Sequence, residues 1–127
     1  MSEAGTRQPS IWIISFEPWP RAMLRAELIE HGYDATGYLM IEQALAELMR
    51  RPAEKPQVII LDLGTQAITP ALLSALAREG VATVILGGAV ELNGPLISEF
   101  TWAGVLRRPF TIGEVVALVK QLVPSPA

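Results

Sequence analysis

Four consecutive apolar residues, Val58-Ile59-Ile60-Leu61, lead directly into the acidic Asp62. The run lacks the apolar–polar alternation of a strand with one face in water, so it predicts a strand buried on both faces of a parallel sheet. Ile11-Trp12-Ile13-Ile14 is a second run of this kind. A charged residue that closes a buried strand is costly to place without a purpose. Asp62 is therefore the first candidate site residue.

Weaker apolar stretches predict three more strands, at 33–39, 81–86 and 105–106. Gly37 interrupts the first of them, which favours an edge position in the sheet. Apolar residues at helical spacing predict five helices between and after the strands. The first follows the loop 17–20 and runs to His31, the second runs from 41 until Pro52 ends it, and the third lies between Thr69 and Gly80. The fourth occupies 92–102 with its true start near Pro95, and the last follows Thr111. Thr69 and Thr111 are predicted N-caps.

Five short strands that alternate with five helices predict an α/β, doubly wound fold. The brief connections allow only right-handed crossovers onto a parallel sheet, with helices on both faces in three layers. In such folds the functional site lies outside the carboxyl ends of the strands. The residues that the sequence places there are Ser15, Phe16, Glu17, Asp62, Gly64, Gly87, Gly88, Arg107 and Arg108.

Composition narrows the functions open to this fold. The chain has 127 residues, half of them hydrophobic, which suits one domain, expected at 10–123 with flexible termini at 1–9 and 124–127. It has no cysteine and a single histidine, which excludes thiol chemistry and a histidine metal cluster. The net charge of -3 comes from scattered residues, so no nucleic-acid partner is expected. A polar N-terminus and the lack of any run of roughly 18 to 20 apolar residues predict a cytoplasmic protein with no membrane partner.

The chain resembles the receiver domain of bacterial response regulators, over nearly all of Ser10 to Val123. Three stretches carry the resemblance: His31-Gly32-Tyr33-Asp34 with Glu42-Gln43-Ala44-Leu45, then Val58 to Leu63, then Leu106-Arg107-Arg108-Pro109-Phe110. Each is weak alone, but their order and spacing together are fairly specific. The resemblance implies the flavodoxin-like strand order 2-1-3-4-5.

The resemblance also implies that Asp62 stands at the phosphoacceptor position. An aspartyl phosphate forms only if a dication, usually Mg²⁺, neutralises the phosphoryl oxygens, and the family supplies two acids for it after the first strand. Here Ser15 and Phe16 stand at those positions. Glu17 is the only acid nearby, and we interpret it as a solvated acid beside a helix N-terminus. We therefore expect no metal cofactor, with Mg²⁺ held by Glu17 and Asp62 as the alternative.

Further family positions are also altered. The hydroxyl residue that bonds the phosphoryl group aligns with Gly88, and the aromatic residue that rotates in response aligns with Val105. Arg108 replaces the lysine, whereas Pro109 keeps the proline, where a cis peptide is plausible. We expect Arg108 to form an ion pair with Asp62, in place of the metal and phosphoryl contacts. The alternative is that Arg108 extends into solvent.

These changes favour a pseudo-receiver that acts by binding another signalling protein, with an impaired or absent phosphorylation cycle. The expected partner is a histidine kinase, a phosphotransfer protein or an output protein, and the chain is expected to be a monomer or a weak homodimer. Trp102 and Arg107, on the family's usual docking face, and Trp19, near the first helix, are the candidate partner contacts. Trp102 could instead pack under the fourth helix, and Trp19 could cover the crevice or pack on its own helix.

Three other functions compete with that one. The first alternative is an authentic phosphorelay receiver that accepts phosphate on Asp62 with Mg²⁺. The second is an anion or nucleotide site at Gly87-Gly88, although the chain has neither a GxGxxG fingerprint nor a phosphate loop with lysine. The third, an enzyme, is not expected, because no histidine lies near a serine and no pair of acids lies near the crevice.

Overall fold

A five-stranded parallel sheet forms the centre of the molecule, in the order β2-β1-β3-β4-β5. The computed structural model describes residues 8–64 and 68–125, and Leu96 only by its backbone. The predicted fold class and strand order are confirmed. The strands are β1 Ser10–Ile14, β2 Asp34–Tyr38, β3 Val58–Asp62, β4 Ala82–Gly87 and β5 Gly104–Arg107. The helices are α1 Pro18–Glu30, α2 Ile41–Arg50, α3 Pro70–Arg78, α4 Ala89–Leu92, α5 Pro95–Ser98 and α6 Ile112–Leu122, with a 3-10 turn η2 at Pro52–Glu54.

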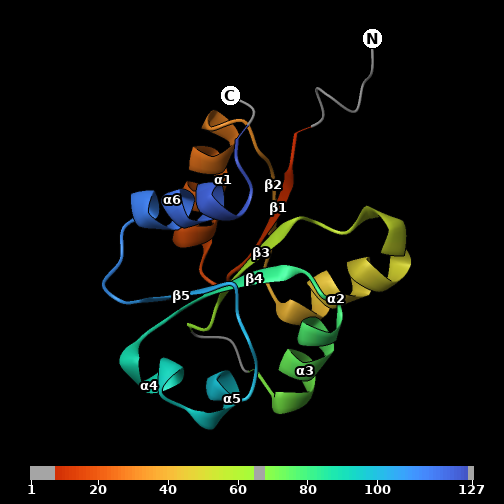
Figure 1. The fold of residues 1–127 in the computed structure, drawn as a ribbon, viewed down its shortest axis with the longest axis vertical. Helices are drawn as coiled ribbons and strands as arrows, with labels where there is room; N and C mark the ends of the chain where they lie inside the picture. Colours follow the sequence, from red (N-terminus) through yellow and green to blue (C-terminus); the bar gives the residue numbers. More distant parts are fainter. Residues whose placement is uncertain (1–7, 65–67, 126–127) are drawn as a thin grey trace.

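The sheet separates two apolar cores, each covered by helices (Figure 1). α1 and α6 cover one face of the sheet, and α2 and α3 cover the other. On the first face Leu24 and Leu28 of α1 pack with strand residues such as Ile60, whereas on the second face Leu48 of α2 packs with residues such as Ile59. Neighbouring residues of one strand thus place their side chains in the two cores on opposite faces of the sheet, and every residue of β3 is buried. This burial explains why the central strands lack polar alternation.

Two helix predictions are corrected by the structure. α1 begins at Pro18, so Trp19 lies in its first turn rather than in a loop. Pro18 suits this place because the first residues of a helix need no backbone N–H donor within it. The predicted fourth helix has its start near Pro95 confirmed, because α5 begins at this residue, but its extent to 102 is wrong, because α5 ends at Ser98 and a separate turn, α4, comes before it at Ala89–Leu92. Pro95 lacks the N–H that would extend the hydrogen bonds of α4, so a new turn begins at this residue.

The two predicted N-caps are confirmed. The Thr69 hydroxyl accepts a hydrogen bond from the Leu72 N–H, and the Thr111 hydroxyl accepts one from the Glu114 N–H at 3.1 Å. The Glu114 carboxylate in turn accepts from the Thr111 N–H at 2.7 Å, which completes a capping box. This box anchors α6, whose Val115, Val116 and Val119 enter the core.

The extent of the domain, expected at 10–123 with flexible termini, stays a prediction. Of the expected flexible termini, residues 1–7 and 126–127 lie outside the described residues. Within the part that the structure describes, no helix is both long enough and apolar enough to span a bilayer.

Replacing Thr111 by alanine should lower the free energy of unfolding by about 1 kcal/mol, because the Glu114 N–H at the start of α6 loses the hydroxyl that accepts its hydrogen bond. Urea unfolding followed by circular dichroism measures the change. Thr101→Ala is the matched control, because Thr101 is exposed between α5 and β5 and caps no helix. Equal midpoints for the two variants would contradict the role of the capping box.

Candidate functional site

Asp62 lies at the carboxyl end of the central strand β3, and only 3% of its surface is exposed. Its carboxylate accepts hydrogen bonds from three directions. The Ser15 hydroxyl donates to Oδ2 at 3.0 Å, the Gly64 N–H donates to Oδ1 at 3.0 Å, and Nη2 of Arg108 lies 2.9 Å from Oδ1. The predicted ion pair between Asp62 and Arg108 is therefore present. Residues from the ends of β1, β3 and β5 meet at this carboxylate.

The backbone around Arg108 directs its side chain toward Asp62. The Arg108 N–H donates to the Gly87 carbonyl at 2.9 Å, which continues the pairing of β4 with β5. The Arg108–Pro109 peptide bond is cis, as the sequence suggested. The guanidinium also lies 5.5 Å from the centre of the Phe110 ring, a favourable position for a cation. Of the two side chains in the pair, Arg108 is 38% exposed and Asp62 is 4% exposed. The pair is thus closed on the aspartate side and open to solvent on the arginine side.

A second arginine, which the sequence did not nominate, reaches the end of β1. Nη1 of Arg21 donates to the Ser15 carbonyl at 2.6 Å and to the Phe16 carbonyl at 3.4 Å. Its aliphatic stem crosses β2 at Gly37, where an added Cβ would lie 3.0 Å from Cγ of Arg21. The sequence indicated Gly37 only as the mark of an edge strand. The glycine at position 37 was therefore visible in the sequence, but its role in making room for Arg21 depended on how α1 packs on the sheet.

The donor set at this edge suits Mg²⁺ poorly. Ser15 is buried and uses its hydroxyl on Asp62, and the Phe16 ring is 45% exposed. Glu17 is exposed at the N-cap of α1, and its side chain makes no cap hydrogen bond. No group of three His, Cys, Asp or Glu side chains that could hold a metal ion occurs among residues 8–64 and 68–125. A magnesium ion prefers several hard oxygen ligands, whereas Asp62 already has a guanidinium beside it.

The other family positions that the sequence singled out, Gly88, Val105 and Pro109, lie in or just after β4 and β5. Gly88 is the N-cap of α4, and its N–H donates to the Glu91 carboxylate at 2.6 Å. The Glu91 carboxylate therefore occupies the N–H donor that a bound anion would need, and its negative charge would repel the anion. This contact argues against a phosphate site at Gly87-Gly88. Val105 on β5 is 46% exposed, and Pro109 is also exposed.

The three predicted partner contacts have different surroundings. Trp102 is half-buried, donates from Nε1 to the Ile97 carbonyl at 3.0 Å, and packs against Phe100. This arrangement agrees with a packing role, the alternative that the sequence left open. Arg107 is exposed at the end of β5. Trp19 is 76% exposed, so most of its surface lies in solvent, and it contributes to the lining of a hollow that also contains Asp62 and Arg108.

A hollow of about 520 Å³ extends from the Asp62–Arg108 pair toward α1. Apart from that pair its lining is apolar, and it lies between the first turns of α1 and the connection from β5 to α6. Its lining consists of Trp19, Pro20, Met23, Leu24, Asp62, Leu86, Arg108, Pro109, Phe110 and Ile112.

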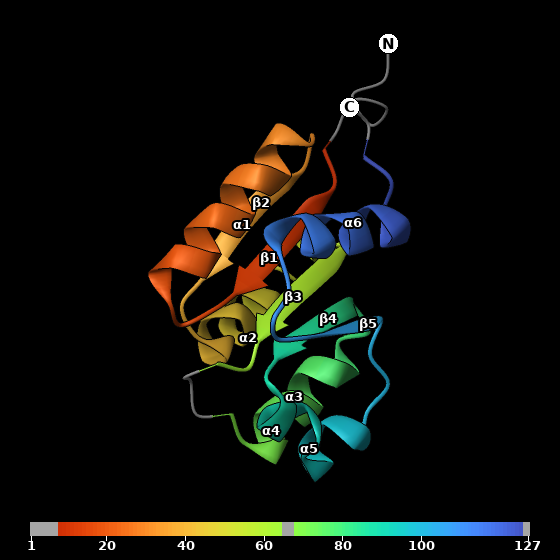
Figure 2. The same cartoon turned by 90° about the vertical axis from the view of Figure 1, so that its left-hand side faces the viewer.

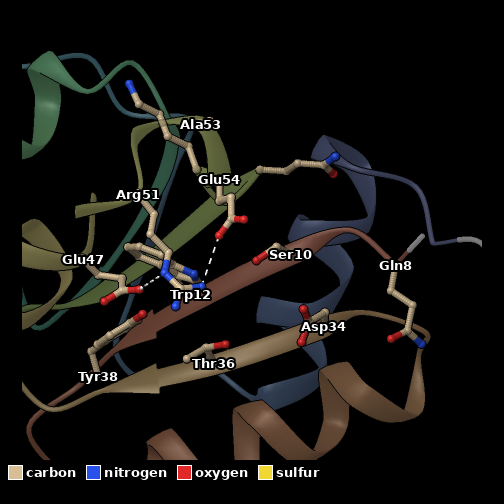
Figure 3. A pocket seen from close by; sticks show the side chains of 12 residues that line it. Gln8, Ser10, Trp12, Asp34, Thr36, Tyr38, Glu47, Arg51, Ala53 and Glu54 are labelled. Atoms are coloured by element: carbon tan, nitrogen blue, oxygen red, sulfur yellow. Dashed lines mark hydrogen bonds and ion pairs between the residues drawn. The ribbon is translucent and has the colours of Figure 1, made fainter. Parts of the chain in front are cut away.

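A larger hollow of about 690 Å³ lies elsewhere, over the first half of β1 and the length of β2 (Figure 3). Its floor carries Trp12 and Tyr38, whose ring centres are 4.8 Å apart. Arg51 spans it from Glu47 at 3.4 Å to Glu54 at 3.3 Å. Asp62 does not line it. We place the candidate site at the smaller hollow, because the predicted residues Asp62, Arg108, Pro109 and Trp19 line it, whereas the charges of the larger one largely pair with one another.

Comparison with solved structures identifies the fold. The chain is similar to a response regulator receiver domain from Clostridium thermocellum (TM-score 0.75, 18% identity, 91% of this chain and 94% of that chain). It is also similar to the chemotaxis protein CheY4 of Vibrio cholerae (0.74, 16%, 92% and 100%) and to a response regulator receiver protein from Burkholderia phymatum (0.73, 17%, 94% and 98%). No protein-family model and no curated protein matches the sequence. At these identities the likeness establishes the fold.

Replacing Arg108 by methionine should lower the free energy of unfolding by about 1–3 kcal/mol, because the buried Asp62 carboxylate loses its guanidinium partner. Asp62→Asn should destabilise less, since the amide carries no charge. The double variant should be more stable than the sum of the two losses predicts, by about 0.5 kcal/mol or more. Urea unfolding of the four proteins measures this coupling, and strictly additive losses would contradict a working ion pair.

Proposed function

We propose that this chain is a receiver-type module of two-component signalling that acts by binding another protein and does not run a regulated phosphorylation cycle. The observation that carries the proposal is the environment of Asp62, whose carboxylate is bonded to Ser15 and paired with Arg108. The receiver-like fold supports the signalling context. Receiver domains act as signalling modules rather than as enzymes, so we propose no enzymatic activity.

The chemistry of phosphoryl transfer explains why this environment opposes phosphorylation. The attacking carboxylate oxygen must be free to meet the phosphorus atom, and a dication must neutralise the charge that develops on the phosphoryl oxygens. Oδ1 of Asp62 accepts from Arg108 and Gly64, and Oδ2 accepts from Ser15. The arginine supplies one positive charge permanently, in a place where the reaction needs a metal that can bind the incoming group.

The altered switch positions support the same function. Gly88 has no hydroxyl to bond a phosphoryl group, and Val105 has no ring to rotate in response. The exposed Val105 and Arg107 on β5, and Trp19 on α1, are the proposed contacts with a signalling protein. We propose a bacterial, cytoplasmic setting and a histidine kinase, a phosphotransfer protein or an output protein as the class of partner.

Incubation with acetyl phosphate and Mg²⁺, followed by intact mass spectrometry, tests the proposal. We expect no stoichiometric gain of a phosphoryl group, because Asp62 stays paired and the metal acids are missing. A gain that disappears in Asp62→Asn would overturn the proposal and favour an authentic phosphorelay receiver. Any gain that persists in Asp62→Asn would come from another residue and would leave the proposal standing.

A restoring variant, Ser15→Asp with Phe16→Asp and Arg108→Lys, should acquire Mg²⁺ binding that the natural chain lacks. Two carboxylates would then stand beside Asp62, and the shorter point charge of lysine would release it from the guanidinium fork. Titration with Mg²⁺ followed by NMR shifts of the Gly64 amide measures the binding. Equal responses of the natural and restored chains would show that the altered acids do not control metal affinity. Ser15→Asn with Phe16→Asn and Arg108→Lys is the uncharged control.

A further inference from the structure

Helix α1 carries apolar residues on the side that faces away from the sheet. It buries Leu24 and Leu28 in the core, and on its outer side Trp19 is 76%, Met23 48% and Ile29 44% exposed. Ala22 and Ala26 are exposed as well. α1 lies at the outside of the molecule beside α6 (Figure 2). Several exposed apolar residues on the outer side of one helix indicate a candidate interaction surface.

The spacing of four of these residues is that of a coiled-coil contact. Trp19, Ala22, Ala26 and Ile29, here named the α1 seam, follow one another at intervals of three, four and three residues. These intervals are those of the a and d positions of a heptad, which point toward a second helix. The alanines in the middle allow close approach of two backbones, and the large residues at the ends supply apolar area. The seam therefore fits a helix that lies along α1.

Charged residues flank the seam and indicate which partner helix would lie along it. Arg25 and Glu30 are exposed at positions equivalent to g and to the e of the next heptad, five residues apart. In a parallel pair of identical helices, a g residue of one copy meets this e residue of the other, so Arg25 would face Glu30 twice. An antiparallel pair would instead bring Arg25 toward Arg25. In the described part of the chain, only Nε of the Arg25 side chain has a hydrogen-bond partner, the Ala35 carbonyl at 2.9 Å.

We propose that α1 is a self-association surface, through which two copies of this chain pair their α1 helices in parallel. The apolar seam supplies the contact, and the two Arg25–Glu30 pairs set the orientation. The surface carries both members of the flanking charge pair, which makes a second copy its complementary partner. α1 has 13 residues, less than two heptads, so the dimer forms only at high protein concentration. The proposal is independent of the chemistry at Asp62.

Sedimentation velocity of the full 127-residue chain, from micromolar to millimolar concentration, tests the proposal. The natural chain should shift from monomer to dimer, and Ala26→Glu should remain monomeric because it places two like charges in the seam. Met49→Glu is the matched control, since Met49 is 78% exposed on α2, outside the seam. A natural chain that stays monomeric throughout would overturn the proposal and assign the seam to a different partner. A dimer that survives Ala26→Glu would overturn it as well.

Charge exchange tests the parallel orientation. Arg25→Glu and Glu30→Arg should each weaken dimerisation by roughly fivefold or more, because two attractive pairs become repulsive. An equimolar mixture of the two variants should recover dimerisation, since each of the two flanking contacts in the mixed dimer would then join one acidic and one basic side chain. A mixture no stronger than either variant alone would overturn the parallel arrangement. If Arg25→Glu fails to fold after losing its bond to Ala35, Glu30→Arg against Glu30→Gln tests the same contact.

Discussion

The pairing of the buried Asp62 carboxylate with the Arg108 guanidinium is the interaction on which the functional end of this molecule depends. A carboxylate with 3% exposure is stable only if other groups replace the hydrogen bonds of water. Ser15, Gly64 and Arg108 do so from three different segments. The carboxylate of Asp62 thereby connects segments at the carboxyl ends of β1, β3 and β5.

The sheet makes this convergence possible. Parallel strands place their carboxyl ends on one edge, and the register that pairs Asp62 with Leu86 sets the depth at which the carboxylate lies. The two apolar cores on either side hold the strands in that register, since a shift by one residue would exchange the faces of every side chain. The same packing directs α1 so that Arg21 reaches the Ser15 carbonyl across Gly37. Stability and site geometry therefore have a common origin in the core.

Sequence reasoning succeeded where the signal was local or periodic. The unbroken apolar run before Asp62 predicted a central strand, and Thr69 and Thr111 predicted two helix starts. Between β4 and β5 it placed a helix start near Pro95 correctly, but it missed the turn α4 and extended the helix past Ser98, where α5 ends. It also overlooked Arg21, because the reach of a side chain depends on the packing of its helix. The role of Trp102 stayed open for the same reason, since its contacts with Ile97 and Phe100 arise only in the folded chain.

The sequence by itself determined the fold class, the strand order through its family resemblance, and the candidate end of the sheet, because periodicity and residue type encode burial. It also showed that two metal acids, a hydroxyl and an aromatic residue of the family pattern are absent at the matching positions. Only the tertiary structure decided between an Arg108 paired with Asp62 and an Arg108 in solvent. Both rotamers are compatible with the chain, and the choice depends on the distance between the ends of β3 and β5, which long-range packing sets.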